Sequence, residues 1–237
     1  MKKALTISVI INILFVLFGG YVIHKKGGID YLKRKFNIQS ETSVKQDYGA
    51  HYYDRKSLFE SLPNDTSEII FLGNSITEGG DWYELFGKGN IKNRGIGGDV
   101  INGVIDRLDE VVESNPKKIF LMIGINDLGR KRTVDQILTD YERLILLIKE
   151  KSPKTVLYIQ SILPTDNREN LQIIDIQTIN KGLIKLTNKY DLIYLNLFDL
   201  LKTKENRLDT VYTYDGLHLK TKGYLVWKKA IENYVTN

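Results

Sequence analysis

Short, mostly apolar runs alternate with longer helical patterns along most of this chain, and this alternation limits its fold more than any other feature. The runs are shorter than a typical helix and apolar at consecutive positions, as expected of strands buried on both faces. Strands that alternate with helices predict right-handed βαβ units and a three-layer α/β/α domain around a parallel sheet. The expected strands are 69–72, 90–93, 118–123, 156–159 and 192–195, and the expected helices are 100–112, 134–148, 171–186 and 224–234.

An apolar segment at the N-terminus does not fit this pattern. Residues 4–23 carry no charge and follow Lys2 and Lys3. At roughly 1.5 Å of rise per residue, such a helix spans about 30 Å of hydrocarbon. No Ala-x-Ala-like site follows, which favours an uncleaved signal anchor over a cleaved peptide that would release a secreted form. A strict positive-inside count places the following domain in the cytoplasm, but a short lysine-bearing tail before a long domain favours export, which we expect.

Charge and composition narrow the possible partners. The formal net charge is +5, but the first 46 residues hold eight Lys or Arg and only two acidic residues. The remainder is therefore close to neutral, and we expect no nucleic-acid partner. The chain contains no cysteine, which excludes disulfides, thiolate metal sites and a cysteine nucleophile.

These observations predict three parts of the chain. A transmembrane signal anchor covers 1–23, a polar stalk covers 24–60, and the α/β domain covers 61–237. Apolar residues within 48–62 predict a short helix packed on the domain surface.

Four short blocks contain the residue types that acyl-transfer chemistry needs. They are 73–76 (Gly-Asn-Ser-Ile), 93–99 (Asn-Arg-Gly-Ile-Gly-Gly-Asp), 124–127 (Gly-Ile-Asn-Asp) and 215–218 (Asp-Gly-Leu-His). Three follow predicted strands and the fourth precedes the last helix, so we expect them at the carboxyl edge of the sheet, where ligands bind. Each block alone also suits an ordinary turn. Together they provide a serine nucleophile, oxyanion donors, a base and an orienting acid.

The small number of histidines narrows the choice of the base. The chain has only His24, His51 and His218. His24 ends the apolar segment, and His51 lies in a polar, tyrosine-rich stretch before the first strand. His218 is therefore the candidate base, and Asp215 precedes it by three residues, close enough to orient the imidazole.

The four blocks resemble those of the SGNH hydrolase superfamily, also called GDSL-type esterases, over residues 66–237. This resemblance implies a flavodoxin-like fold with five parallel strands, no cofactor, and esterase, lipase or carbohydrate-deacetylase activity. The first two blocks are most similar to the platelet-activating-factor acetylhydrolase-like and bacterial carbohydrate-esterase branches. The resemblance assigns five site residues: Ser75 as nucleophile and oxyanion donor, Gly98 and Asn126 as further oxyanion donors, and Asp215 and His218 as the remaining catalytic pair.

Several residues near these blocks have alternative interpretations. Asn74 stands where the family usually has aspartate, which leaves the acid to Asp215. We expect Asp99 and Asp127 to cap helices or support loops. We expect Arg94 to be a solvated loop charge rather than a contact to an acidic substrate. Two aromatic residues, Trp82 and Tyr83, suit either a substrate pocket or the core.

The predicted function is a serine esterase that removes short acyl groups, acetyl above all, from a small-molecule or glycan ester. A lysophospholipase or thioesterase for longer acyl chains is the alternative that a membrane tether also suits. An acyltransferase is another, because the sequence does not distinguish water from a sugar hydroxyl as the acceptor. A non-catalytic glycan-binding protein would predict a damaged site, whereas every required group is present. No cluster has metal-ligand spacing, so we expect no catalytic metal.

Overall fold

The computed structural model describes residues 21, 25 and 47–236 and divides the chain into two units, Met1–Asp47 and Tyr48–Asn237. In the described part, no helix is both long and apolar enough to cross a membrane. The predicted anchor lies outside the described residues except for Tyr21, and most of the predicted stalk lies outside them as well. Both therefore stay predictions.

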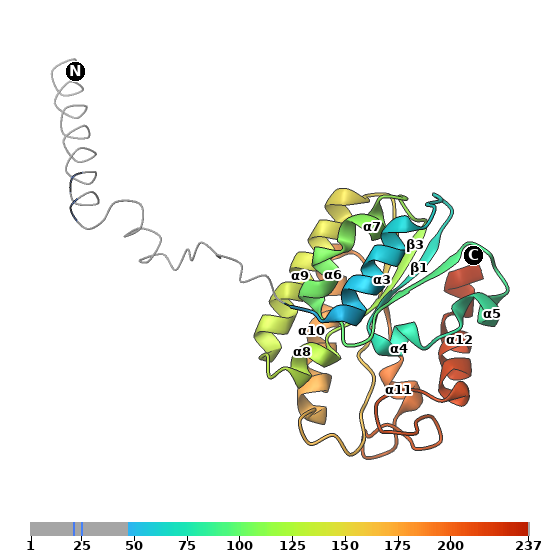
Figure 1. Cartoon of the computed structure of the whole chain (residues 1–237). Helices are drawn as coiled ribbons and strands as arrows, with labels where there is room; N and C mark the ends of the chain where they lie inside the picture. The colour runs from blue at the N-terminus through green and yellow to red at the C-terminus, as the bar shows by residue number, and fades with distance from the viewer. Residues whose placement is uncertain (1–20, 22–24, 26–46, 237) are drawn as a thin grey trace, which may run out of the picture. The chain divides into compact units, whose positions relative to one another are not determined.

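The second unit is built on a five-stranded parallel sheet flanked by helices (Figure 1). The spatial order of the strands is β2-β1-β3-β4-β5, and every neighbouring pair is parallel. β1 and β3 are buried along their whole length, which explains their continuous apolar sequence. All five predicted strands are confirmed: β1 is Ile69–Gly73, β2 Ile91–Gly95, β3 Lys118–Met122, β4 Val156–Gln160 and β5 Ile193–Leu195.

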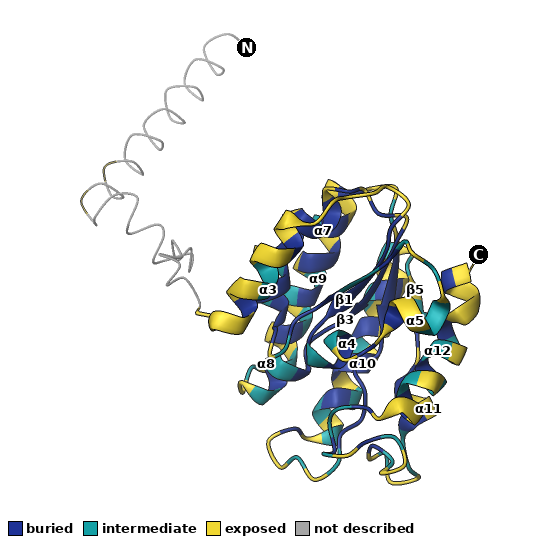
Figure 2. Ribbon diagram, turned by 45° about the vertical axis from the view of Figure 1, so that its right-hand side comes forward, coloured by how far each residue is buried: buried dark blue, intermediate teal, exposed yellow. Residues whose placement is uncertain are grey.

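Helices form a layer on each face of the sheet (Figures 1 and 2). On one face, α6, α7 and α10 each contact α9; on the other, α12 contacts α5 and α11. The short helices α4 and α8 directly follow β1 and β3. The bounds are α4 Ser75–Glu78, α5 Trp82–Phe86, α6 Ile101–Asp106, α7 Leu108–Val112, α8 Ile125–Gly129, α9 Val134–Lys151, α10 Ile173–Tyr190, α11 Phe198–Leu201 and α12 Thr221–Thr236.

One predicted helix, 100–112, is interrupted in the structure. Arg107 separates α6 from α7 with φ −117° and ψ 15°, outside the helical region. Its side chain is fully buried. At this interruption the Arg107 side chain forms buried ion pairs with Asp99 and Glu110.

Stacked aromatic rings fill the space between the sheet and the layer of α5 and α12. Phe71, Phe120 and Tyr158 are register partners on β1, β3 and β4, and their neighbouring ring centroids lie 5.1 and 4.5 Å apart. Trp82 stacks on Phe71 at 4.1 Å, and Trp227 of α12 meets it edge-on at 4.7 Å. Trp82 is therefore a core residue.

The structure places the start of the domain earlier than the predicted residue 61. Residues Ala50–Ser61 form helix α3, and the compact unit begins at Tyr48. Tyr52 and Phe59 on α3 are buried against Ile96, which follows β2. The predicted surface helix is present, but it belongs to the domain and not to a polar stalk. The compact unit therefore includes α3, which lies in the segment predicted as the stalk.

Candidate active site

Ser75 lies at a sharp turn between β1 and α4, at the carboxyl edge of the sheet. Gly73 ends β1, and a Cβ there would lie 2.3 Å from the Met122 carbonyl oxygen, so the turn needs glycine. The Asn74 side chain accepts a hydrogen bond from the Ile76 backbone N–H at 3.0 Å and caps α4. Asn74, which stands where aspartate is usual, thus acts as the N-cap of α4.

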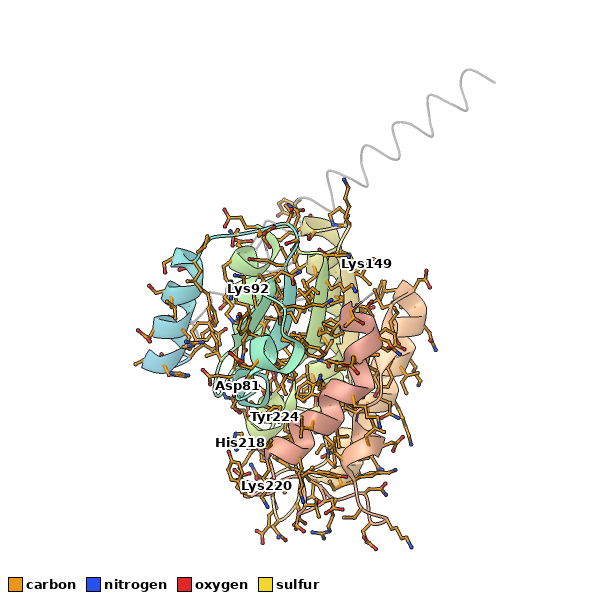
Figure 3. All side chains as sticks on the ribbon, turned by 90° about the vertical axis from the view of Figure 1, so that its right-hand side faces the viewer. Asp81, Lys92, Lys149, His218, Lys220 and Tyr224 are labelled. Atoms are coloured by element: carbon orange, nitrogen blue, oxygen red, sulfur yellow. The ribbon has the colours of Figure 1, made fainter. Side chains whose placement is uncertain are left out.

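The structure brings Ser75, His218 and Asp215 into one hydrogen-bonded line. The His218 Nε2 atom lies 3.0 Å from the Ser75 Oγ atom, and His218 Nδ1 lies 2.7 Å from an Asp215 carboxylate oxygen. The last two residues come from the loop before α12, far along the chain from Ser75. In Figure 3, His218 lies close to Tyr224 and Lys220 within the second unit, whereas Lys149 lies toward the opposite side of that unit.

Asp215 is held ionised by its surroundings. The backbone N–H groups of Leu217 and His218 donate to Asp215 Oδ1 at 3.0 and 2.8 Å. Although partial burial opposes ionisation, the hydrogen bonds from the His218 ring and from these two amides lower the pKa of Asp215 to about 2. An ionised Asp215 favours the His218 tautomer with the proton on Nδ1. Nε2 is then free to accept the Ser75 hydroxyl proton.

The two remaining predicted residues, Gly98 and Asn126, belong to segments that contact each other. Gly98 has φ +76°, a conformation that favours glycine, in the loop after β2. Asn126 on α8 donates from its side-chain amide to the Asp99 carbonyl at 2.9 Å. A side-chain amide has two N–H donors, so this bond orients Asn126 and leaves its second donor for a ligand. The loop also reaches the nucleophile turn, because the Ile96 N–H donates to the Gly73 carbonyl.

A buried charge network braces this loop, and the sequence patterns did not reveal it. Arg107 contacts the Asp99 carboxylate at 3.0 Å and Glu110 at 3.2 Å, and it donates to the Gly73 and Arg94 carbonyls. Arg94 itself pairs with Glu110 at 3.1 Å and is 3% exposed. The expectation that Arg94 is a solvated loop charge is therefore wrong. The two buried guanidinium groups are tolerated here because each of them pairs with a buried carboxylate.

Both acidic residues expected to support loops do so. The Asp99 side chain accepts a hydrogen bond from the Val100 N–H and pairs with Arg107. Burial raises the pKa of Asp99, although the pairing with Arg107 acts in the opposite direction. Asp127 accepts from the Ile101 N–H at 3.1 Å. Burial raises the pKa of Asp127 to about 6. These contacts link α8 to the start of α6 and fix the loop between β2 and α6.

Helix α3 covers the network from outside. The Phe59 ring lies 4.7 Å from the guanidinium carbons of both Arg55 and Arg94. His51 on the same helix pairs with Glu78 of α4 at 3.0 Å, beside Gly97 in the loop after β2. Helix α3 therefore contacts both the helix that begins at Ser75 and the loop that contains Gly98. It precedes the nucleophile in the chain, and its own sequence is too polar to reveal this role.

We expect Phe59→Ala to destabilise the domain by about 3–5 kcal/mol, because it leaves a cavity beside buried guanidinium groups. Urea unfolding followed by circular dichroism measures this change. Leu58→Ala is the matched control, because Leu58 is 43% exposed on the same helix and the substitution should change stability by about 0.5 kcal/mol or less. Equal destabilisation by the two substitutions would contradict a structural role for α3.

The family comparison covers most of the described domain. The model of the GDSL-like lipase/acylhydrolase family matches residues 71–226. The chain belongs to this family. The description of this family is that of lipases and acylhydrolases. Within the residues described, no group of three or more His, Asp or Glu side chains is arranged to hold a metal ion.

The matches to curated proteins cover only part of each relative. An N-acylneuraminate cytidylyltransferase of Streptococcus agalactiae is 28% identical over 165 residues, which cover 69% of this chain and 37% of the relative. The bovine platelet-activating factor acetylhydrolase IB subunit alpha1 is 28% identical over 109 residues, covering 44% of this chain and 46% of the relative. The GDSL-family chain thus spans less than half the length of these curated relatives.

Solved structures match over more of the chain. A Streptococcus pneumonia protein provisionally described as a platelet activating factor gives a TM-score of 0.70 at 30% identity, covering 78% of this chain and 92% of the other. The acetyl xylan esterase AlAXEase gives a TM-score of 0.59 at 24% identity, covering 71% of this chain and 99% of the other. The second likeness shows the shared fold alone.

Proposed function

We propose that this GDSL-family hydrolase is a serine esterase with Ser75 as nucleophile, His218 as base and Asp215 as the orienting acid. The observation that carries the proposal is the line from Ser75 Oγ to His218 Nε2 and from His218 Nδ1 to Asp215. His218 takes the hydroxyl proton as Ser75 Oγ attacks the ester carbonyl. It then returns this proton to the leaving alcohol, and the acyl group stays on Ser75.

The oxyanion formed in this step needs donors at the carbonyl oxygen. We assign the backbone N–H groups of Ser75 and Gly98 and the second amide hydrogen of Asn126. The bond from Asn126 to the Asp99 carbonyl positions that amide before substrate binds, which is the condition for effective electrostatic stabilisation. In the second half, His218 accepts a proton from water, and the hydroxide oxygen attacks the acyl-enzyme. The carboxylic acid leaves and Ser75 regains its proton.

The acyl group that fits best is short. A small, mostly apolar cavity is lined by Asn74 and Ile76, which flank Ser75 in the sequence, and by Ile125, which precedes Asn126, and its volume is about 10 Å³. This is about the space of one water molecule, so a short acyl group suits this cavity better than a long one. The name of the acetylhydrolase relative agrees with an acetyl substrate.

The leaving group that we propose is a sugar. Tyr214 lies directly before Asp215 and is 69% exposed, and its ring is nearly parallel to the His218 ring, with centroids 6.4 Å apart. An exposed flat ring beside the proton donor offers an apolar face to a pyranose, while the sugar hydroxyl leaves toward His218. This arrangement supports a carbohydrate ester as substrate.

The test is hydrolysis of p-nitrophenyl esters from acetate to decanoate by the full-length chain, with Ser75→Ala as control. We expect a serine-dependent rate that falls steeply beyond butyrate. A rate that rises with chain length would replace this proposal with a lysophospholipase or thioesterase. Transfer of the acetyl group to an added sugar alcohol in preference to water would identify an acyltransferase.

A further inference from the structure

A guanidinium group touches the proposed catalytic acid directly. The Arg168 Nη2 atom lies 3.1 Å from Asp215 Oδ2 and donates to the Asp215 backbone carbonyl at 2.8 Å. Arg168 comes from the loop between β4 and α10, which carries none of the four sequence blocks. The carboxylate oxygen that it contacts is the one that also accepts from His218 Nδ1.

The loop that carries Arg168 is docked on the loop that carries the catalytic pair. The Asp166 N–H donates to the Gly216 carbonyl at 2.8 Å. Gly216 has φ +80°, and a Cβ there would lie 2.0 Å from the Asp166 carbonyl oxygen, so only glycine permits this approach. A second backbone bond joins Leu208 to Thr165. These backbone hydrogen bonds hold the loop of Arg168 in place next to Asp215.

This contact has an electrostatic consequence for the base. The Asp215 carboxylate stabilises protonated His218, and a guanidinium on the same oxygen offsets part of that negative charge. The other charged groups nearby act elsewhere: Arg207 pairs with Asp166, and the Lys220 ammonium donates to the Thr210 carbonyl. Apart from the His218 ring itself, Arg168 is the one cationic side chain among the described residues in ion-pair contact with Asp215.

We propose that Arg168 is a positioning residue that fixes the Asp215 carboxylate and limits how strongly it holds a proton on His218. This inference rests on the proposed function. A less stabilised imidazolium is a stronger acid, so it returns its proton more readily to the leaving alcohol. Arg168 thus favours proton release in the first half of the reaction and keeps His218 available as a base at lower pH.

The kinetic test compares Arg168→Gln, Arg168→Lys and Arg207→Gln. For Arg168→Gln we expect kcat to fall about tenfold, within the roughly 10² that a displacement of about 1 Å can cost. The acidic limb of the kcat/KM profile should move to higher pH by about half a unit, since the lost charge was partly screened by solvent. Arg168→Lys should restore most of the wild-type profile. Arg207→Gln, which removes a contact in the same loop pair but none to Asp215, should leave the profile unchanged.

A second measurement needs no catalysis and separates the two proposals. In the Ser75→Ala background, the His218 ring proton is followed by NMR against pH, with assignment aided by the low histidine content. We expect Arg168→Gln to raise the midpoint of this titration by about half a unit. An unchanged midpoint, or an equal change in Arg207→Gln, would overturn the role of Arg168. Failure of the proposed esterase function would appear separately, as a wild-type chain without Ser75-dependent hydrolysis.

Discussion

Ser75→Ala is expected to lower kcat for ester hydrolysis by about 10⁶, because removing the nucleophile of such a triad disables the whole unit. His218 and Asp215 stay in place in this variant but have no hydroxyl to activate. The oxyanion donors still bind the carbonyl oxygen, so a rate of about 10³–10⁴ over uncatalysed hydrolysis can remain. The measurement is kcat on p-nitrophenyl acetate at saturating substrate.

The fold should survive this substitution. Ser75 is only partly buried, and the start of α4 is capped by Asn74 and not by Ser75. An unchanged Tm would show that the loss of rate is chemical. Ser61→Ala is the matched control, because its hydroxyl donates only to the Leu58 carbonyl at the exposed end of α3. Wild-type activity in Ser75→Ala would remove Ser75 from the proposed mechanism.

The centre of the sheet could be predicted from the sequence because β1 and β3 are buried on both faces. Burial of both faces produces an uninterrupted apolar run such as 69–72, and each run ends where the chain reaches the carboxyl edge. The chemical residues follow those runs directly, so topology alone brings Ser75 and Asn126 to one edge. The proximity of Asp215 to His218 could be predicted from spacing, since three residues separate them.

The supporting contacts of the site could not be predicted in this way. Arg94 and Arg107 look like solvent-exposed residues in sequence, since a buried arginine is acceptable only when its partners surround it. Those partners come from separate segments, including Asp99 after β2 and the Gly73 carbonyl at the end of β1. Arg168 likewise reaches Asp215 across two loops. Local sequence patterns do not predict contacts between segments that are distant in the chain.

Helix α3 shows the same limit at a domain boundary. Its two buried aromatic residues, Tyr52 and Phe59, lie among charged and polar neighbours, so the segment resembles a stalk in composition. A helix that contacts the domain along a narrow stripe needs few apolar residues. The sequence predicted the helix but not that it covers the charge network behind the loop of Gly98.

Asp215→Asn is expected to lower kcat by about 10⁴ while leaving the geometry of the site intact. The carboxylate accepts the Nδ1 proton of His218, whereas an asparagine amide can donate to Nδ1 and so favour the tautomer with its proton on Nε2. That tautomer has no lone pair for the Ser75 hydroxyl proton. Pre-steady-state acylation with p-nitrophenyl acetate measures the loss at the step where it arises.

The same substitution makes a prediction about stability against pH. Asp215 has a pKa lowered from 3.8 to about 2 in the folded chain, so its ionised form stabilises the fold above pH 4. This contribution disappears as the pH falls through about 2, and after allowance for solvent screening it is about 1 kcal/mol. Asp215→Asn should therefore flatten the acid part of the stability curve, measured by urea unfolding between these limits.

Two comparisons decide whether the loss of activity in Asp215→Asn reflects the proposed unit. Asp199→Asn removes an exposed carboxylate that pairs with Lys202, and it should retain wild-type kcat. Because residues that act as a unit are strongly non-additive, the double variant Ser75→Ala, Asp215→Asn should be no slower than Ser75→Ala alone. A further loss of several orders of magnitude in the double variant would mean that Asp215 acts independently of Ser75. Its hydrogen bond to His218 would then have another purpose, and the assignment of the three residues to one proton path would have to be abandoned.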